Sequence, residues 1–364
     1  MEHKEHFHGS DLEKIEAVYG IKKEEIISFS ANVNPLGLSP KVKEELSIHA
    51  DCLTRYPDRE YTDLRKAIGC YVNTSFENVW VGNGSSELIA LFVKLCNPKH
   101  ALIFGPTYSE YEHEIMLYGG KSTYFELRES DNFAPDIDAL YEKISDDIDL
   151  LIICNPNNPT SAVISRDVIK GILEKCASLN ITVMIDETYM EFVEDYESVT
   201  AIALADEFKN LIVLRGISKF FASPGLRLGY CVTSDHKLTS DLRACQIPWS
   251  VNSLAEAAGK IMFSDVKYIK DTKAYIAKER RRIYARLLQI PALKVYKPQA
   301  NFILCRIENS SVTAQDLFDA AIKEKLMIRD CASFTFLDES YFRLCFMKED
   351  DNDKLMDVIE RVFA

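Results

Sequence analysis

The sequence predicts an α/β fold, a mostly parallel sheet with helices on both faces, followed by a smaller α+β domain. Two observations lead to this prediction. From about residue 78, short apolar runs such as "DLLIIC" and "ITVMIDE" alternate with segments of helical periodicity such as "SRDVIKGILEKCASL", as strands and helices do in α/β proteins. Beyond residue 255 this alternation stops, and a long charged helical pattern precedes two further apolar runs.

The expected elements follow one another in chain order. Strands are predicted at 78–82, 100–104, 149–154, 181–187 and 210–216, with helical patterns at 85–95, 109–119 and 165–179 between them. Because these strands are apolar throughout, we expect both faces of the sheet to be covered. A helix at 265–289 and strands at 300–307 and 341–347 around another helix make up the smaller domain. We therefore expect an N-terminal arm that belongs partly to the small domain (1–45), a large domain (46–255) and a C-terminal small domain (256–364).

Composition excludes several classes of protein. A net charge of −13 over 364 residues argues against a nucleic-acid or anionic-membrane surface. The ten cysteines include no C-x-x-C pair, so neither a zinc site nor a secreted disulfide framework is expected. The N-terminal segment has no apolar core, and no run of 18 apolar residues follows. We expect a cytoplasmic protein without a metal.

Polar residues follow directly on several predicted strands. The turn "GNGSSE" follows 78–82, "NPNNPTS" follows 149–154, and Asp186 and Tyr189 follow "ITVMI". Ligands bind beyond the carboxyl ends of parallel strands, and a helix start favours a phosphate. Taken alone, the first turn is better explained by an ordinary serine helix cap, and Asp186 could also merely cap a helix. Each turn alone leaves both interpretations open.

Lys219 has unusual neighbours, in "RGISKFFASPGLRLGY". It follows an apolar run and precedes two phenylalanines. Burial would lower the pKa of this amine and make it a nucleophile. Its stem could equally lie on apolar surface with its head in water.

Together these residues match the needs of pyridoxal phosphate, namely a lysine for covalent attachment, a carboxylate for the ring nitrogen, and cationic or N–H groups for the phosphate. Lys219, Asp186 and the Gly84 turn with Arg227 supply them. The sequence also resembles the fold-type I pyridoxal-phosphate enzymes of the aspartate aminotransferase superfamily. "NPNNPT", "IDETY", "SKFFASPGLRLGY" and "YFRL" carry the resemblance, in the same order and over nearly the whole chain. It implies a fold like that of the pyridoxal-phosphate-dependent transferases.

The resemblance implies roles around the cofactor ring. Lys219 would bind it covalently and move a proton, and Asp186 would pair with the ring nitrogen. Asn158 and Tyr189 would hydrogen-bond the phenolic oxygen. Tyr108, in "GPTYSEY", would stack on the ring, unless it is a tyrosine of the core. The expected catalytic residues are Lys219, Asp186 and Tyr189.

The same resemblance implies a phosphate site and a second subunit. Gly84, Ser85, Ser218 and Arg227 would hold the cofactor phosphate. Tyr56, in "RYPD", resembles the tyrosine that crosses to the partner's phosphate, so a homodimer with shared active sites is expected.

For the substrate we expect two anionic groups, because arginine forks suit both carboxylate and phosphate. Two arginines near apolar strands are not explained by a basic surface in so acidic a chain, although structural ion pairs would also account for them. The expected substrate-binding residues are His8, Gly9, Asn32, Asn158, Arg329 and Arg343.

Two positions depart from the family pattern. Gly216 stands three residues before Lys219, where a serine or threonine is usual, so one phosphate hydroxyl is missing and Ser218 must contribute more. Ser161 ends "NPNNPTS", where the family has glycine. Its backbone angles are therefore an open question.

Three functions remain open. "RYPD", "PGLRLGY" and Arg329 resemble the branch that contains histidinol-phosphate aminotransferases and threonine-phosphate decarboxylases. "HGS" at 8–10, "FSANVNPLG" at 29–37 and "IPWSVN" at 247–252 favour the decarboxylases, which make the aminopropanol phosphate linker of cobalamin. An aminotransferase of histidine biosynthesis is the alternative. A cofactor-binding protein without activity is the third, disfavoured by the intact set of Lys219, Asp186 and Arg343.

Overall fold

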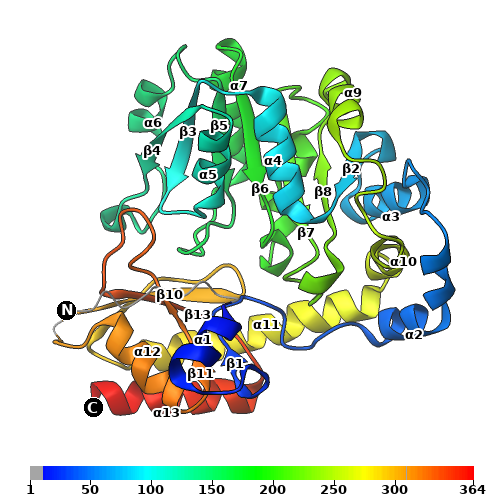
Figure 1. Ribbon diagram of the computed structural model, residues 1–364. Coiled ribbons are helices and arrows are strands. Elements are labelled where there is room, and N and C mark those ends of the chain that lie inside the picture. Colours follow the sequence, from blue (N-terminus) through cyan, green and yellow to red (C-terminus); the bar gives the residue numbers. More distant parts are fainter. Residues whose placement is uncertain (1–10, 309) are drawn as a thin grey trace.

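The computed structural model describes residues 11–308 and 310–364 and contains a large and a small sheet (Figure 1). The large sheet has seven strands in the order β2-β8-β7-β6-β5-β3-β4. They are β2 (Val79–Gly82), β3 (His100–Gly105), β4 (Lys121–Glu126), β5 (Leu150–Cys154), β6 (Thr182–Asp186), β7 (Leu211–Gly216) and β8 (Gly229–Val232). The strands from β7 to β4 pair in parallel, and β8 is antiparallel to β2 and β7. The predicted α/β class is confirmed.

Both faces of this sheet are buried, as the apolar strands predict. Within β5, Leu151 and Ile153 point into one core, while Leu150 and Ile152 point into the other. Side chains of α4, α5 and α9 cover the second face, and those of α3, α6, α7 and α10 cover the first. These helices are α3 (Thr62–Val72), α4 (Gly84–Cys96), α5 (Glu110–Leu117), α6 (Ile137–Lys143), α7 (Arg166–Ser178), α9 (His236–Cys245) and α10 (Ser253–Met262); α2 (Pro40–Ile48) packs on α10, and α8 (Tyr196–Val199) is short.

The small sheet is antiparallel, with strand order β12-β13-β10-β9. It lies below the large sheet in Figure 1, beside the C-terminal helix. A two-stranded sheet pairs β1 with β11, which links an N-terminal segment to the C-terminal part of the chain. The elements of this region are α1 (Leu12–Tyr19), β1 (Ile27–Ser28), β9 (Leu293–Val295), β10 (Phe302–Ile307), α12 (Ala314–Lys323), β11 (Leu326–Met327), β12 (Arg329–Asp330), β13 (Tyr341–Cys345) and α13 (Glu349–Phe363).

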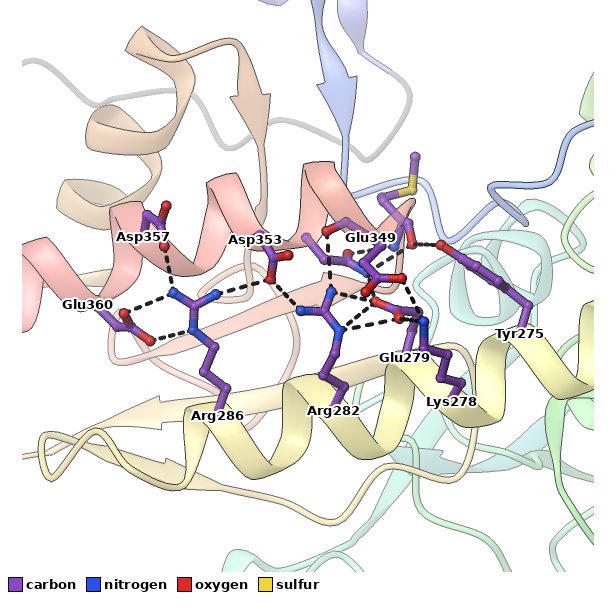
Figure 2. A network of polar contacts seen from close by, with 11 residues as sticks. Tyr275, Lys278, Glu279, Arg282, Arg286, Glu349, Asp353, Asp357 and Glu360 are labelled. Carbon is purple, nitrogen blue, oxygen red and sulfur yellow. Dashed lines mark hydrogen bonds and ion pairs between the residues drawn. The ribbon is translucent and has the colours of Figure 1, made fainter.

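The long helix α11 (Val266–Leu287) extends below the large sheet and is tied to α13 by a row of charges (Figures 1 and 2). Arg286 bonds to Glu360 and Asp357 at 2.6 Å each. The fully buried Glu279 accepts from Arg282 at 2.7 Å and from Asn352 at 2.8 Å. The contacts of Arg286 and Glu279 with residues of α13 hold that helix against α11.

Neither predicted domain boundary coincides with a loop, because residues 45 and 255 lie inside α2 and α10. The three-part division stays a prediction. Within residues 11–308 and 310–364, no helix is both long enough and apolar enough to cross a membrane.

Candidate active site

The carboxyl ends of β5, β6 and β7 lie side by side, and three of the predicted residues follow them. Cys154 pairs in register with Asp186, and Asp186 pairs with Leu214. Asn158 follows β5, Asp186 ends β6 and Lys219 follows β7. The edge of a parallel sheet thus gathers residues that lie far apart in sequence.

Lys219 is half-buried, and its Nζ donates a hydrogen bond to the carbonyl of Ala31 at 2.6 Å. Burial, the largest cause, and the guanidinium groups of Arg343 and Arg227 together lower the pKa of this amine to about 8. Removal from water and nearby positive charge both disfavour the ammonium form. At pH 7 roughly a tenth of the side chains are therefore neutral amine, and this share grows as the pH rises.

Asp186 is buried and held by three donors. Its Oδ2 accepts from the Tyr111 hydroxyl at 2.7 Å, while its Oδ1 accepts from the Thr188 N–H at 2.9 Å and hydroxyl at 2.6 Å. The ring of Tyr108 stands edge-on to Tyr111, with centroids 5.7 Å apart. Burial raises the pKa of Tyr108 to about 12, so its hydroxyl stays protonated. These hydrogen bonds hold the Asp186 carboxyl group in one position beside the ring of Tyr111.

Gly84, Ser85 and Arg227 meet where α4 begins. Gly84 has φ 81°, and a Cβ there would overlap the guanidinium of Arg227. A Cβ at Gly216 would lie 3.4 Å from Ser85 Oγ and 3.8 Å from Ser218 Oγ. All the predicted phosphate-binding residues of this chain except Tyr56 therefore surround one helix start, where free N–H groups and the helix dipole favour an anion.

Arg343, on β13, points from the small sheet toward the turn after β5. Its Nη1 donates to Asn158 Oδ1, and its Nη2 donates to the Ser30 carbonyl at 2.7 Å. Phe302 lies under the guanidinium, 5.3 Å from Cζ to ring centroid. Arg343 is 4% exposed and has no carboxylate partner within the described residues.

Arg329 is the register partner of Arg343 across β12 and β13. It donates to Ser333 Oγ at 2.8 Å, is 5% exposed, and likewise has no ion pair inside the part of the chain that the structure describes. Burial lowers the pKa of Arg329, and the charge of Arg343 lowers it further. Asp330 and Asp11 act in the opposite direction and raise the pKa of Arg329. The two buried cations therefore lie side by side without an ion pair to the described residues, although these two carboxylates lie near Arg329.

Asn32 and Tyr189 complete the cluster from other segments. Asn32 has φ 55°, and its Nδ2 donates to the Tyr189 hydroxyl at 3.3 Å. Burial raises the pKa of Tyr189. Asn301, which the sequence did not indicate, donates to the Asn32 carbonyl at 2.9 Å.

Several buried polar atoms around these residues have no hydrogen-bond partner among residues 11–308 and 310–364. Buried polar atoms in folded proteins are nearly always paired, so unpaired atoms gathered beside a lysine and two arginines indicate room for a polar ligand. They are Ser30 Oγ, Asn32 Oδ1, Thr107 Oγ1, Asn301 Oδ1 and Arg343 Nε. With the glycine at the start of α4 against Arg227, this set fits pyridoxal phosphate and a substrate.

Three predicted residues are not part of the described cluster. Tyr56 is 79% exposed, and its ring contacts that of Trp249 at a tilt of 35°, with centroids 4.6 Å apart. His8 and Gly9 lie outside the described residues. The sequence also did not indicate Tyr111 and Thr188, which bind Asp186. A tyrosine in a helical segment such as Tyr111 is indistinguishable in sequence from a tyrosine of the hydrophobic core.

Comparison with known proteins agrees with this geometry. The model of the family "aminotransferase class I and II" matches residues 24–359. The threonine-phosphate decarboxylase of Salmonella typhimurium is 35% identical over 98% of this chain and 96% of its own length. The adenosylcobalamin biosynthesis bifunctional protein of Leptospira interrogans is 30% identical over 98% of this chain and 41% of that protein.

Among solved structures, the histidinol-phosphate aminotransferase from Clostridium acetobutylicum superposes with a TM-score of 0.86 at 34% identity, covering 92% of this chain and 98% of that one. The family model, the sequence matches and the structural superposition each cover nearly the whole chain. The chain belongs to the aminotransferase class I and II family of pyridoxal-phosphate enzymes.

Proposed function

We propose that this enzyme decarboxylates L-threonine O-3-phosphate to aminopropanol phosphate, a step in cobalamin biosynthesis. The observation that carries the proposal is the pair of buried guanidiniums, Arg329 and Arg343, without an ion pair to the described residues. Two adjacent buried cations are costly unless anions offset them. A substrate with both a carboxylate and a phosphate does so, and the similarity to a threonine-phosphate decarboxylase supports that choice.

The cofactor-facing residues have separate tasks in this proposal. When bound, pyridoxal phosphate supplies an electron-accepting ring that takes up the electron pair of the bond broken at the substrate α-carbon. Asp186 keeps a proton on the ring nitrogen, and Asn158 and Tyr189 hydrogen-bond the ring oxygen. Tyr108 stacks on the ring, and Lys219 holds the cofactor covalently.

The phosphate of the cofactor is assigned to the start of α4. Gly84 and Ser85 offer backbone N–H groups, Ser218 offers a hydroxyl and Arg227 a positive charge. Gly216 has no side chain and lies beside the hydroxyls of Ser85 and Ser218. In this proposal those two hydroxyls take the place of the serine or threonine hydroxyl that other members of the family have at this position.

For the substrate, we assign the carboxylate to Arg343 and the phosphate to Arg329, with Asn32, His8 and Gly9. Once the substrate amine has displaced Lys219 from the cofactor and given it a proton, the carbon–carbon bond to the carboxylate would break and carbon dioxide would leave. The Lys219 ammonium would then deliver its proton to the α-carbon. Which bond breaks depends on the orientation that the anion-binding groups impose, a positioning effect of a few kcal/mol.

An aminotransferase acting on histidinol phosphate is the second candidate. It is favoured by the 34% identity and TM-score of 0.86 to an enzyme of that name. The two buried arginines would then bind phosphate in one half-reaction and the carboxylates of 2-oxoglutarate in the other.

A product assay separates the two. The holoenzyme is given L-threonine O-3-phosphate without a keto acid, and released carbon dioxide is measured; in parallel, histidinol phosphate and 2-oxoglutarate are tested for glutamate. Serine phosphate and unphosphorylated threonine serve as controls for the methyl and phosphate groups. We expect carbon dioxide from the phosphorylated threonine; glutamate without carbon dioxide would identify an aminotransferase.

We further propose a cytoplasmic homodimer. All ten cysteines are free, which suits a reducing compartment. Exposed apolar side chains gather around the tyrosine expected to cross to a partner, where α10 meets α2 and the segment after it. These residues are Ile48, Leu53, Tyr56, Ile247 and Trp249, and a second copy of the chain would cover them.

A further inference from the structure

Ser161 adopts a backbone conformation that does not suit a serine. It ends the turn after β5, is fully buried and has φ 61°. The Cβ of an L-residue is crowded in this left-handed region, whereas glycine is not. Backbone sterics alone therefore favour glycine here, and the serine side chain needs another reason to be present.

The hydroxyl of Ser161 accepts two backbone hydrogen bonds from a distant segment. Its Oγ accepts from the N–H of Gln299 at 3.0 Å and from the N–H of Ala300 at 2.8 Å. Residues 299 and 300 lead into β10 of the small sheet. Among the described residues these N–H groups have no other acceptor, and unpaired buried N–H groups are costly.

On the large-sheet side, the turn that Ser161 ends carries part of the active site. Asn158 accepts from Arg343. Asn157 donates from Nδ2 to the Pro106 carbonyl at 2.9 Å, in the loop that carries Tyr108. The turn is closed by the bond from the Ser161 N–H to the Asn157 carbonyl at 2.7 Å.

On the small-sheet side, the residues after Ala300 form a wall of the same site. Asn301 bonds to the Asn32 carbonyl. The ring of Phe302 lies under the Arg343 guanidinium and stands edge-on to Tyr189, with centroids 4.9 Å apart. Arg343 therefore rests between Asn158 and Phe302, the two sides that the Ser161 hydroxyl joins.

We propose that Ser161 is a positioning residue that sets the place of Arg343 by joining the turn after β5 to the segment before β10. It acts through backbone N–H groups and does not touch reacting atoms. The inference rests on the proposed function only in assigning the substrate carboxylate to Arg343. Loss of the hydroxyl should loosen the contact between the two sheets and weaken substrate binding, while the cofactor groups of the large sheet stay in place.

Two variants separate the hydroxyl from the backbone strain. Ser161→Gly removes the hydroxyl and relieves the strain, whereas Ser161→Ala removes the hydroxyl and keeps the Cβ. Asn180→Gly is the matched control, because Asn180 has φ 59° and forms no side-chain hydrogen bond with the other described residues. Each protein is loaded with cofactor and checked by its absorbance.

Amide hydrogen exchange is the first readout, because it needs no activity. Exchange at Gln299 and Ala300 should speed up roughly tenfold in both Ser161 variants and stay unchanged in Asn180→Gly. The second readout is KM for the amino substrate that the wild type turns over. It should rise roughly tenfold or more, because small misplacements of binding groups are costly, with cofactor absorbance retained.

Unchanged exchange at the two amides, an unchanged KM in Ser161→Gly, or an effect confined to Ser161→Ala would overturn the proposal. A wild type that forms glutamate but no carbon dioxide would refute decarboxylation only, because the same comparison then uses KM for the amine of that reaction. If the wild type turns over neither substrate, the exchange rates alone decide the proposal.

Discussion

Burial and positive charge give Lys219 its reactivity. The amine lies at the end of β7, with a pKa lowered to about 8 by burial first and then by Arg343 and Arg227. An ordinary lysine has a pKa of about 10.4 and is almost fully protonated at neutral pH. The neutral fraction of Lys219 grows as pH rises through about 8.

We predict that cofactor attachment to the cofactor-free enzyme follows this titration. The rate of covalent attachment should rise between pH of about 7 and about 9 and then level off, because only the neutral amine attacks the aldehyde. In Arg343→Gln one nearby positive charge is removed, so the midpoint should move upward. A rate that stays flat over this range would contradict the lowered pKa.

The role proposed for Asp186 requires its negative charge as well as its position. We predict that Asp186→Asn lowers kcat far more than cofactor affinity, by roughly 10- to 100-fold, because charge-assisted bonds are worth about 1.5–3 kcal/mol. Asp136→Asn is the control for the same change away from the site, because Asp136 is exposed and only caps the start of α6. Wild-type turnover in Asp186→Asn would contradict the assigned role.

At the scale of elements, the contacts between α11 and α13 include one fully buried carboxylate, that of Glu279. We predict that Glu279→Gln lowers the free energy of unfolding by about 1–3 kcal/mol, because Arg282 and Asn352 then face a neutral amide. Lys267→Ala breaks an exposed pair with Asp271 inside α11, away from Glu279, and should cost under about 1 kcal/mol. Urea denaturation measures both, and equal losses would show that burial of Glu279 is unimportant.

The elements that the sequence predicts best are the strands buried on both faces. The strands β5, β6 and β7 are apolar runs with both faces covered, so their ends and the residues after them could be located. The edge strand β4, "KSTYFE", is largely exposed along its length, so its composition carries little strand signal. The short strand β8 begins two residues after Arg227, inside the family motif, so the sequence does not separate it from that motif.

The candidate site was predicted as far as its residues follow strands or match the family. Asn301 and Ser30 were not found, because their roles come from contacts between segments roughly 270 residues apart in the chain, such as that of Asn301 with Asn32. Ser161 was noticed as a departure from glycine, but the reason, two N–H groups from the small sheet, exists only in the folded chain.

At the scale of the whole molecule, the proposed dimer explains why Tyr56 stands away from the cluster. We predict that mixing Tyr56→Phe with Lys219→Ala subunits restores activity, because each mixed dimer then has one site with both residues intact. Tyr56→Phe alone must be severely impaired, and exchange of subunits is verified with tagged chains. No recovery despite exchange would exclude a shared site.

Lys219 is the residue assigned to carry the cofactor, and the other roles in the site are placed around it. Borohydride reduction of the holoenzyme fixes the cofactor to its lysine, and peptide mass mapping identifies the position. We predict a single labelled peptide containing Lys219, and a folded Lys219→Ala protein that binds the cofactor without any label. A label on another lysine would contradict the site, its proposed chemistry and the roles assigned around it.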